Sequence, residues 1–235
     1  MRLNNFIAAS GICSRRQADE YIRQGRIDVN RKTVTDFGIF IEPEKDDVRF
    51  DGQRIKPKEH IYILLNKPKG VVSTTADEKG RKTVINLIKT KERIFPVGRL
   101  DFNTTGVILL TNDGDFTNVM LHPGHKIPRT YVAEIHKPLS EEDQLKLQKG
   151  FVYEGKFSKF DKVSVHKRGL VAEVTVTEGR NHFVKNLFKK LGYFVNELHR
   201  KSYANFTDRD LPIGAYRFIT KSEIKAFYKK YEPAE

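Results

Sequence analysis

Three short stretches of the chain carry side chains that could take part in chemistry. Asp101 follows Gly98-Arg99-Leu100 and precedes a Thr-Thr-Gly turn that runs into the apolar segment VILLT. Tyr131 lies in the alternating segment RTYVAEI, and Lys185 lies in the basic segment TEGRNHFVKNLFKKLG. These stretches offer a carboxylate, an aromatic ring and a cation. Each also has an ordinary structural interpretation, as a turn residue, a half-buried strand aromatic and a solvated helix lysine, and spacing alone does not bring the three together.

Several familiar catalytic and metal-binding motifs are absent from the sequence. It contains no Gly-x-x-x-x-Gly-Lys-Ser/Thr loop, no Gly-x-Gly-x-x-Gly at a helix start and no Gly-x-Ser-x-Gly elbow. The single cysteine, Cys13, excludes an intramolecular disulfide and a cysteine-cluster metal site. Of the seven histidines, His122 and His125 come closest to a ligand pair, but the Pro-Gly between them breaks any helix that would present both. We therefore expect no metal site.

The charge of the chain points to a polyanionic partner. Its 235 residues include 43 Lys and Arg against 30 Asp and Glu, a formal net charge of +13. Basic side chains that contact phosphates release condensed counterions, so nucleic acid is the favoured partner. A membrane surface is the other polyanion to consider, yet no long apolar run, signal peptide or lipidation motif supports insertion. The sequence thus predicts a soluble, cytoplasmic protein that binds nucleic acid.

The first 55 residues read as a small separate module. Residues 2–32 have the pattern of two short helices followed by a β-hairpin, with Ser14 as the N-cap of the second helix. Arg23 suits the C-terminus of that helix, where a cation complements the helix dipole. Arg15 and Arg16 open the same helix, where positive charge is mildly unfavourable unless an anion is held there. We favour a phosphate-binding surface as the interpretation of this module.

Residues 56–235 read as a larger domain of mixed helices and strands. Alternating residues predict strands in RTYVAEIHK and LVAEVTVTEGR, and VILLT is predicted to be a buried strand. Helices are predicted in SEEDQLKLQKG, with Ser140 as N-cap, and in HFVKNLFKKLG, which ends at Gly192. The acidic, proline-containing segment EPEKDDVRFDGQRI would join the two domains, which gives boundaries of 1–55 and 56–235.

The segment RLNNFIAASGICSRRQADEYIRQGRIDVNRK resembles the S4 RNA-binding domain, through its SRR-x-A-D helix start and its G-R-I-x-V-N hairpin. The glycine that usually follows this Asn is Arg31 here, so the hairpin tip departs from the pattern. The resemblance implies an RNA-binding surface formed by the basic residues of the module. These are Arg2, Arg15, Arg16, Arg23 and Lys32.

Four further segments resemble the successive motifs of the RsuA/RluB-type pseudouridine synthases, bacterial enzymes that act on ribosomal RNA. They are KPKGVVSTT, FPVGRLDFNTTGVILLTNDGDF, RTYVAEI and EGRNHFVKNLFKKLGYFVNELHR. The resemblance implies an α+β protein in which a small S4-like module precedes a catalytic domain built on a mainly antiparallel sheet. Asp101 would be the catalytic aspartate, Tyr131 would pack on the target base, and Lys185 would be the basic partner of the aspartate. Leu187 would form an apolar wall of the pocket, and further substrate or RNA contacts would come from Arg99, Arg129 and Arg180.

The resemblance also implies a reaction and a partner. Pseudouridine formation breaks the C1′–N1 bond of a uridine, turns the uracil and rejoins it through C5. No electrons or energy need be supplied, so no cofactor is expected. The expected partner is ribosomal RNA or an assembling ribosomal subunit, bound by a monomer. The overall motif set favours large-subunit (23S) RNA, whereas VKNLF and ELHR are closer to the small-subunit (16S) branch.

Two alternative functions remain possible, and one segment of the sequence departs from the family pattern. A non-catalytic RNA-binding factor of ribosome assembly would have the same composition, but it has no physical need of the Asp101 motif. A glycosidase-like hydrolase would need a second positioned acid, and Asp113 and Asp115 look like turn and cap residues. The family segment E-G-R-N-R-Q-V-R-R-M is EGRNHFVKNL here, so Phe183 and Asn186 are expected to alter RNA contacts.

Overall fold

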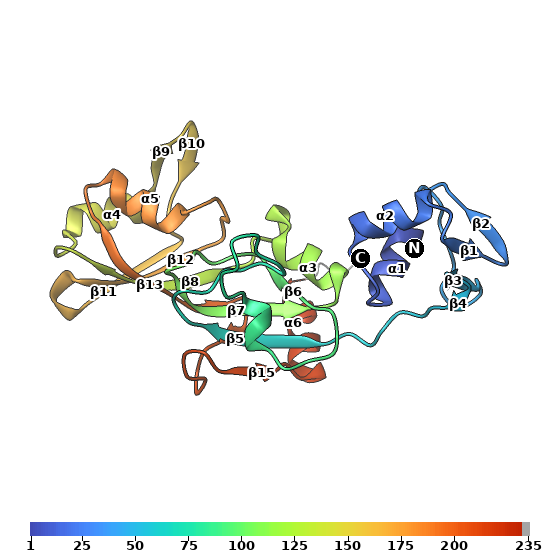
Figure 1. The fold of residues 1–235 in the computed structure, drawn as a ribbon. Helices are drawn as coiled ribbons and strands as arrows, with labels where there is room; N and C mark the ends of the chain where they lie inside the picture. Colours follow the sequence, from blue (N-terminus) through green and yellow to red (C-terminus); the bar gives the residue numbers. More distant parts are fainter. Residues whose placement is uncertain (232–235) are drawn as a thin grey trace. The chain divides into compact units, whose positions relative to one another are not determined.

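The computed structural model describes residues 1–231, and the chain divides into two compact units (Figure 1). The first contains Met1–Ile61 together with Thr90–Arg93, and the second contains Tyr62–Lys89 together with the chain from Ile94 onward. Each unit has its own sheet and its own hydrophobic core, and the fold class is α+β, as predicted. Among the described residues no helix has both the length and the apolar character needed to span a membrane.

The first unit packs two helices against a four-stranded antiparallel sheet of order β2-β1-β3-β4. Apolar side chains of both helices meet Ile27 and Val48 of the sheet in one buried cluster. The hairpin between β1 and β2 turns at Asn30 and Arg31, whose φ angles are 52° and 65°. Two left-handed residues in succession suit a two-residue hairpin turn, so Arg31 takes the conformation that a glycine would otherwise supply. The elements are α1 (Leu3–Ala9), α2 (Arg15–Arg23), β1 (Ile27–Val29), β2 (Lys32–Val34), β3 (Val48–Phe50) and β4 (Gln53–Arg54).

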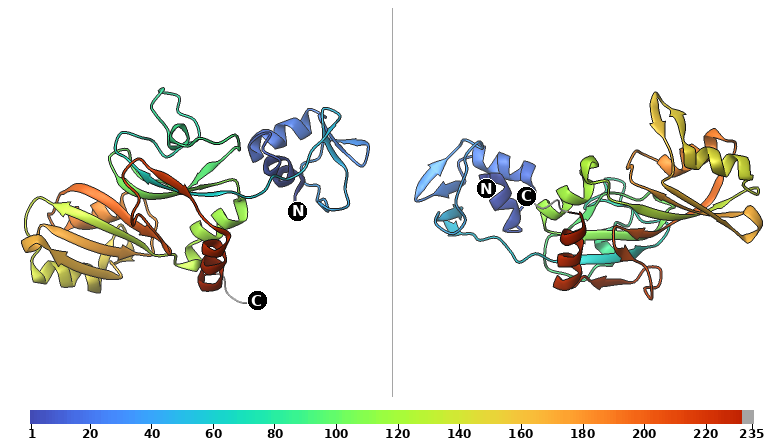
Figure 2. Two further views of the ribbon diagram at one scale, coloured as in Figure 1. Left: turned by 90° about the horizontal axis from the view of Figure 1, so that it is seen from below. Right: turned by 180° about the vertical axis from the view of Figure 1, so that it is seen from behind.

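The second unit is built on a nine-stranded mixed sheet whose main path is β11-β12-β8-β13-β7-β5-β15 (Figures 1 and 2). Two short strands extend it, because β14 pairs with β13 and β6 pairs with β7. Neighbouring strands are antiparallel except β7 and β13, which run parallel. The strands are β5 (Tyr62–Lys67), β6 (Phe95–Val97), β7 (Thr105–Thr111), β8 (Arg129–Ile135), β11 (Lys162–His166), β12 (Val171–Val176), β13 (Val195–Tyr203), β14 (Phe206–Thr207) and β15 (Tyr216–Phe218). A separate hairpin is formed by β9 (Phe151–Tyr153) and β10 (Lys156–Ser158).

Helices build two hydrophobic cores on this sheet. One core includes Leu147 of α4, Leu187 of α5 and Ala133 of β8. The other gathers around Phe116 of α3 and Phe227 of α6, whose rings meet edge to face with centroids 5.0 Å apart. Figure 2 shows α3 and α6 together at one part of the sheet and α4 and α5 together at another. The helices are α3 (Gly114–Leu121), α4 (Glu141–Lys149), α5 (Phe183–Lys190) and α6 (Lys221–Tyr231), with short 3-10 turns at Val84–Leu87, Pro123–His125 and Lys167–Gly169.

Strands β7 and β13 approach each other closely at Gly106. The φ angle of this glycine is +108°, and a Cβ atom there would collide with the backbone of Arg200. Glycine is needed for both reasons, because other residues rarely adopt this conformation and all of them carry a Cβ. Across the parallel pair Thr105 lies opposite His199, and Gly106 lies opposite Arg200. The loop that leads into β7 is thereby placed beside the middle of β13.

A capping box at the start of α6 gives a prediction about stability at acid pH. Glu223 accepts from the Thr220 amide at 2.9 Å and from Arg217 at 2.7 Å, and its own amide donates to the Thr220 hydroxyl at 3.2 Å. These contacts lower the pKa of Glu223 from 4.5 to about 2, and the hydrogen bond from Arg217 has the largest effect. The stabilisation is therefore complete above pH 4.5 and is lost as the pH falls toward 2. We expect Glu223→Gln to lower the free energy of unfolding at pH 7 by about 1 kcal/mol and to flatten the acid limb of the stability profile. Chemical denaturation from pH 2 to 7 measures both effects, and an unchanged acid limb contradicts the prediction.

Candidate active site

Asp101 lies in the loop 98–104, between β6 and β7. Ser73 holds the preceding residue, because its hydroxyl donates to the Leu100 carbonyl at 2.9 Å and accepts from the Leu100 amide at 3.1 Å. The Thr104 amide donates to the Asp101 carbonyl at 3.1 Å and closes the turn. The backbone that carries the carboxylate is therefore held on both sides, as a reacting group requires.

A buried lysine that sequence reasoning missed supports the same loop. Lys67, at the end of β5, is fully buried, and its ammonium donates to four backbone carbonyls. Three of these carbonyls belong to the loop, those of Asp101 at 3.1 Å, Phe102 at 3.3 Å and Thr104 at 2.8 Å. A buried ammonium without acceptors would be costly, and here the carbonyl oxygens surround it. Lys67 thus anchors the Asp101 loop to the central sheet.

The charge state of Lys67 is sensitive to pH above neutrality. Burial lowers the pKa of Lys67 to about 8, although the nearby Asp101 carboxylate favours the charged form. The positive charges of Arg200 and Lys185 lower the pKa further. At pH 7 the loop is accordingly held by a charged group, and that group loses its proton just above the neutral range.

Two side chains from the start of α5 contact the Asp101 carboxylate. Lys185 Nζ donates to Oδ2 at 2.8 Å, and His182 Nε2 lies 3.1 Å from Oδ1. The Thr104 hydroxyl donates to Oδ2 at 3.4 Å. His182 precedes α5 with a left-handed φ of 52°, a conformation that brings its ring beside the aspartate. The side chain of Asp101 stays 30% exposed, so a ligand can reach the carboxylate that these groups orient.

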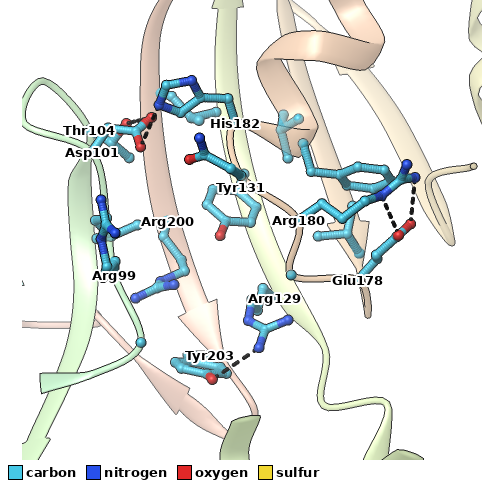
Figure 3. Close-up of a pocket in the computed structure, with 18 of the residues that line it drawn as sticks. Arg99, Asp101, Thr104, Arg129, Tyr131, Glu178, Arg180, His182, Arg200 and Tyr203 are labelled. Carbon is cyan, nitrogen blue, oxygen red and sulfur yellow. Dashed lines mark hydrogen bonds and ion pairs between the residues drawn. The ribbon is translucent and has the colours of Figure 1, made fainter. Parts of the chain in front are cut away.

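A pocket of about 520 Å³ opens between the Asp101 loop and strands β8 and β13 (Figure 3). Asp101 and His182 lie at one end of it and Tyr203 lies at the other, with Tyr131 of β8 between them. A second hollow, of about 530 Å³, adjoins the same loop and shares Asp101 and His182 with the first. The apolar side chains that line the first pocket are Leu100, Leu121, Val176, Phe183, Val184 and Leu198.

Leu187 does not line this pocket, which corrects the expectation that it forms an apolar wall. It is fully buried in the core cluster of α4 and α5. Residues two apart on a helix point about 200° away from each other, and Lys185 faces Asp101, so Leu187 points into the core. Phe183 and Val184, in the first turn of α5, form this part of the wall instead.

The different surroundings of Leu187 and Lys185 give a paired prediction. We expect Leu187→Ala to lower the free energy of unfolding by about 2–5 kcal/mol, because it leaves a cavity in a packed core. Lys185→Ala should change stability by less than about 1 kcal/mol, because the side chain is partly exposed, while it removes a contact of Asp101. Urea denaturation of both variants at pH 7 measures the difference. A smaller cost for Leu187→Ala than for Lys185→Ala would be incompatible with this packing.

Comparison with known proteins identifies the family. A family model described as RNA pseudouridylate synthase matches residues 61–190, and an S4 domain model matches residues 1–48. The chain belongs to the RNA pseudouridylate synthase family. It is 39% identical to the ribosomal large subunit pseudouridine synthase B of Bacillus subtilis strain 168, over 95% of this chain and 94% of that protein. It is 36% identical to the dual-specificity RNA pseudouridine synthase RluF of Escherichia coli K12, over 99% of this chain and 80% of that protein.

A solved structure supports the same assignment. A crystal structure of a pseudouridylate synthase superimposes with a TM-score of 0.67 and 30% identity, over 96% of this chain and 98% of that chain. The predicted family, the S4 domain and the enzyme class are therefore confirmed, and the protein is a pseudouridine synthase that acts on RNA. Within residues 1–231 no three His, Cys, Asp or Glu side chains gather as metal ligands.

Three arginines that we predicted to contact substrate or RNA, Arg99, Arg129 and Arg180, all line the pocket, but their surroundings differ. Arg99 is exposed and has no hydrogen-bond or ion-pair partner in the described part of the chain. Arg180 is engaged within the protein, since it pairs with Glu178 at 3.0 Å. Arg129 is buried and donates to the Tyr203 hydroxyl at 3.1 Å. A fourth arginine that lines the pocket, Arg200 of β13, is buried and was not predicted from the sequence.

The predicted RNA-binding cations of the S4 domain lie on its surface. Arg15 and Arg16, at the start of α2, form no ion pair within residues 1–231. Arg23, at the end of α2, pairs with Glu20 at 2.6 Å, and both side chains are exposed. An exposed pair of this kind contributes little to stability, so Arg23 can exchange its partner for a phosphate at small cost. The exposed cations of the prediction are Arg2, Arg15, Arg16, Arg23 and Lys32.

Proposed function

We propose that this synthase converts a uridine of large-subunit ribosomal RNA to pseudouridine, with Asp101 as the catalytic residue. The observation that carries the proposal is the geometry around the Asp101 carboxylate. Lys185 contacts it at 2.8 Å, His182 lies at 3.1 Å, and the carboxylate lines a pocket together with Tyr131. A protein that only bound RNA would have no use for a carboxylate oriented in this way.

The reaction requires stabilisation of charge at the sugar. Cleavage of the C1′–N1 bond leaves C1′ electron-deficient, and a carboxylate beside the sugar stabilises or traps that centre, as in glycoside hydrolysis. The uracil then turns and bonds through C5 to C1′. C5 gives up its proton and N1 gains one, so the product is an isomer of the substrate. Lys185 and His182 orient Asp101 for this step, because each contacts a different oxygen of the carboxylate.

The target base must leave the RNA stack to reach Asp101, as base-modifying enzymes generally require. Tyr131 lies between the two ends of the pocket, where its ring would stack on the extruded uracil and contribute about 1–3 kcal/mol. Phe183 and Leu198 add apolar surface to the same pocket. A flat base held against the tyrosine ring presents its sugar to the carboxylate.

The two parts of the chain would have different roles, RNA binding and catalysis. Residues 1–55 would dock the RNA, because the S4 domain exposes Arg15 and Arg16, which have no ion-pair partner among the described residues, and backbone phosphates bind such cations. Residues 56–235 would carry out the isomerisation. Large-subunit RNA is favoured because the B. subtilis relative, at 39% identity, is named a ribosomal large subunit synthase. The RluF relative is named a dual-specificity RNA synthase, so other RNAs belong in the test.

Tritium release from labelled RNA tests the proposal. C5 loses its hydrogen when it bonds to C1′, so RNA labelled with tritium at uridine C5 releases tritium as it reacts. We expect tritium release from large-subunit transcripts to level off when a small fixed number of uridines per transcript has reacted. Small-subunit transcripts and transfer RNA should release no tritium. Release from small-subunit RNA alone would overturn the large-subunit assignment. No release from any of these RNAs, or from ribosomal precursors isolated from cells, would overturn the proposed reaction.

A further inference from the structure

The hairpin of β9 and β10 exposes two large apolar side chains on its outer face. Val152 and Phe157 lie directly opposite each other across the two strands, and they are 68% and 63% exposed. Directly opposed residues share a face of a hairpin, so the two side chains form one apolar patch. The hairpin projects from the second unit beside α4 and α5 (Figures 1 and 2). A phenylalanine as exposed as this gains little from burial, so packing does not account for its presence.

The inner face of the hairpin packs against the protein and contacts the wall of the pocket. Phe151 and Tyr153 pack against the core cluster of α4 and α5. Arg180, which lines the pocket, donates to the Tyr153 carbonyl at 3.4 Å and to the Ser158 hydroxyl. These contacts support a two-stranded hairpin that would be only marginally stable alone. Val152 is the neighbour of Tyr153 in the chain, so the outer face lies close to the pocket wall.

The ring of Phe157 is held in place by a glycine. A Cβ atom at Gly150 would lie 2.5 Å from Cζ of Phe157 and 3.0 Å from Cβ of Lys159. The absence of this atom lets the ring rest against the backbone of Gly150, while most of the ring stays open to solvent. A ring that is already held loses little conformational freedom when a flat partner packs on it.

Three lysines border this apolar patch. Lys149 and Lys156 are exposed, and neither side chain has an ion-pair partner within residues 1–231. The ammonium of Lys159 comes no closer than 3.9 Å to Asp161, and its side chain is half exposed. The turn of the hairpin carries one exposed carboxylate, Glu154, so the surroundings of the patch stay positive. An open aromatic ring beside such cations suits single-stranded nucleic acid, whereas a second copy of the chain would bring like charges together.

We propose that the outer face of the β9–β10 hairpin binds an unpaired stretch of the substrate RNA next to the target uridine. A base of this stretch stacks on Phe157, and the adjacent phosphates contact Lys149, Lys156 and Lys159. A base that stacks on the hairpin cannot pair within the RNA at the same time. The hairpin therefore selects uridines whose neighbours are unpaired. The proposal requires only that the enzyme acts on RNA, and it is independent of the target RNA and of the role of Asp101.

Filter binding of two RNAs to the full chain at constant salt tests the proposal. The probes are a short single-stranded oligouridylate and a fully paired RNA duplex. We expect Phe157→Leu to weaken binding of the oligouridylate about tenfold, because leucine has no flat face for stacking, and binding of the duplex by less than about twofold. Phe157→Tyr keeps the ring and should bind both RNAs as the wild type does. Ultraviolet cross-linking of the oligouridylate, followed by peptide mapping, should place a link at Phe157.

Phe218→Leu is the matched control. Phe218 is an exposed phenylalanine of β15 in the same unit, 55% exposed, and its replacement should leave both affinities unchanged. Lys156→Gln provides a second variant, because no described contact depends on its side chain. It should weaken oligouridylate binding and lower the slope of log affinity against log salt by about one. If urea denaturation shows that Phe157→Leu disturbs the fold, Lys156→Gln and the cross-link decide.

Three outcomes would overturn the proposal. Unchanged oligouridylate binding by Phe157→Leu would remove the stacking contact. An equal loss of single-stranded and duplex binding, or a loss in Phe157→Tyr as large as in Phe157→Leu, would assign the residue to the fold. A wild-type dimer in sedimentation that Phe157→Leu dissociates would assign the outer face to a second copy of the chain. Tritium release plays no part in these measurements, so failure of the proposed reaction or of the large-subunit assignment is detected separately.

Discussion

Asp101→Asn is expected to abolish pseudouridine formation while RNA binding persists. The amide keeps the shape of the side chain, but it lacks the negative charge that stabilises or traps the electron-deficient C1′. Loss of such a charge should lower the rate of tritium release at least about a thousandfold. The dissociation constant for ribosomal RNA should stay within about threefold, because most of that affinity comes from phosphate contacts. Single-turnover kinetics and a filter-binding assay measure the two quantities separately.

Asp115→Asn provides the matched control for this substitution. Asp115 is an exposed carboxylate in the first turn of α3, and it lines neither pocket. We expect its replacement to lower the stability of α3 by less than about 1 kcal/mol through the helix dipole, with turnover unchanged. Wild-type turnover by Asp101→Asn would remove the aspartate from the mechanism.

Lys67→Met is expected to have the second largest effect. The variant loses the ammonium that binds the carbonyls of Asp101, Phe102 and Thr104, so the loop loses its anchor to β5. We expect the free energy of unfolding to fall by about 1–3 kcal/mol, because buried carbonyls lose their donor. A displaced Asp101 loop should lower turnover about a hundredfold. Lys69→Met, which changes an exposed lysine of the same KPKG segment, should leave both quantities near those of the wild type.

The pKa of Lys67 gives a pH dependence with opposite effects on activity and stability. As the pH rises through about 8, Lys67 loses its charge and one N–H donor, so turnover should fall. Between pH 8 and 10.5 the folded protein binds fewer protons at this site than the unfolded chain does, so this group makes the folded state more stable as the pH rises. A loss of stability caused by deprotonation of Lys67 therefore cannot explain the fall in turnover. Turnover that is level from pH 7 to 9.5 would contradict the anchoring role of the charged lysine.

Features that depend on neighbours in the chain were predictable from the sequence. Ser14 and Ser140 cap α2 and α4, and each hydroxyl accepts from the amide three residues later. The alternating segments around Tyr131 and Val174 form β8 and β12, where these two residues pair. Family resemblance linked Asp101 with a lysine 84 residues away, and the structure brings their side chains into contact. Spacing alone gives no such long-range pair.

Features that depend on distant backbone atoms or on helix phase were not predictable. Lys67 binds carbonyls 34 to 37 residues further along the chain, and backbone carbonyls have no sequence signature. Arg200 lies in a strand whose register shifts on both sides of its central part, so simple alternation does not show which side chains face the pocket. Leu187 was placed by family resemblance at the pocket wall, and the phase of α5 turns it into the core.

Mapping of pseudouridine in cells tests the central claim most directly. Carbodiimide adducts on pseudouridine stop reverse transcription, so ribosomal RNA from cells with and without this gene can be compared position by position. We predict that deletion removes at least one stop in large-subunit RNA, and that the wild-type gene restores it but Asp101→Asn does not. An unchanged pattern of stops after deletion, or restoration by Asp101→Asn, would contradict the claim that Asp101 of this chain modifies ribosomal RNA.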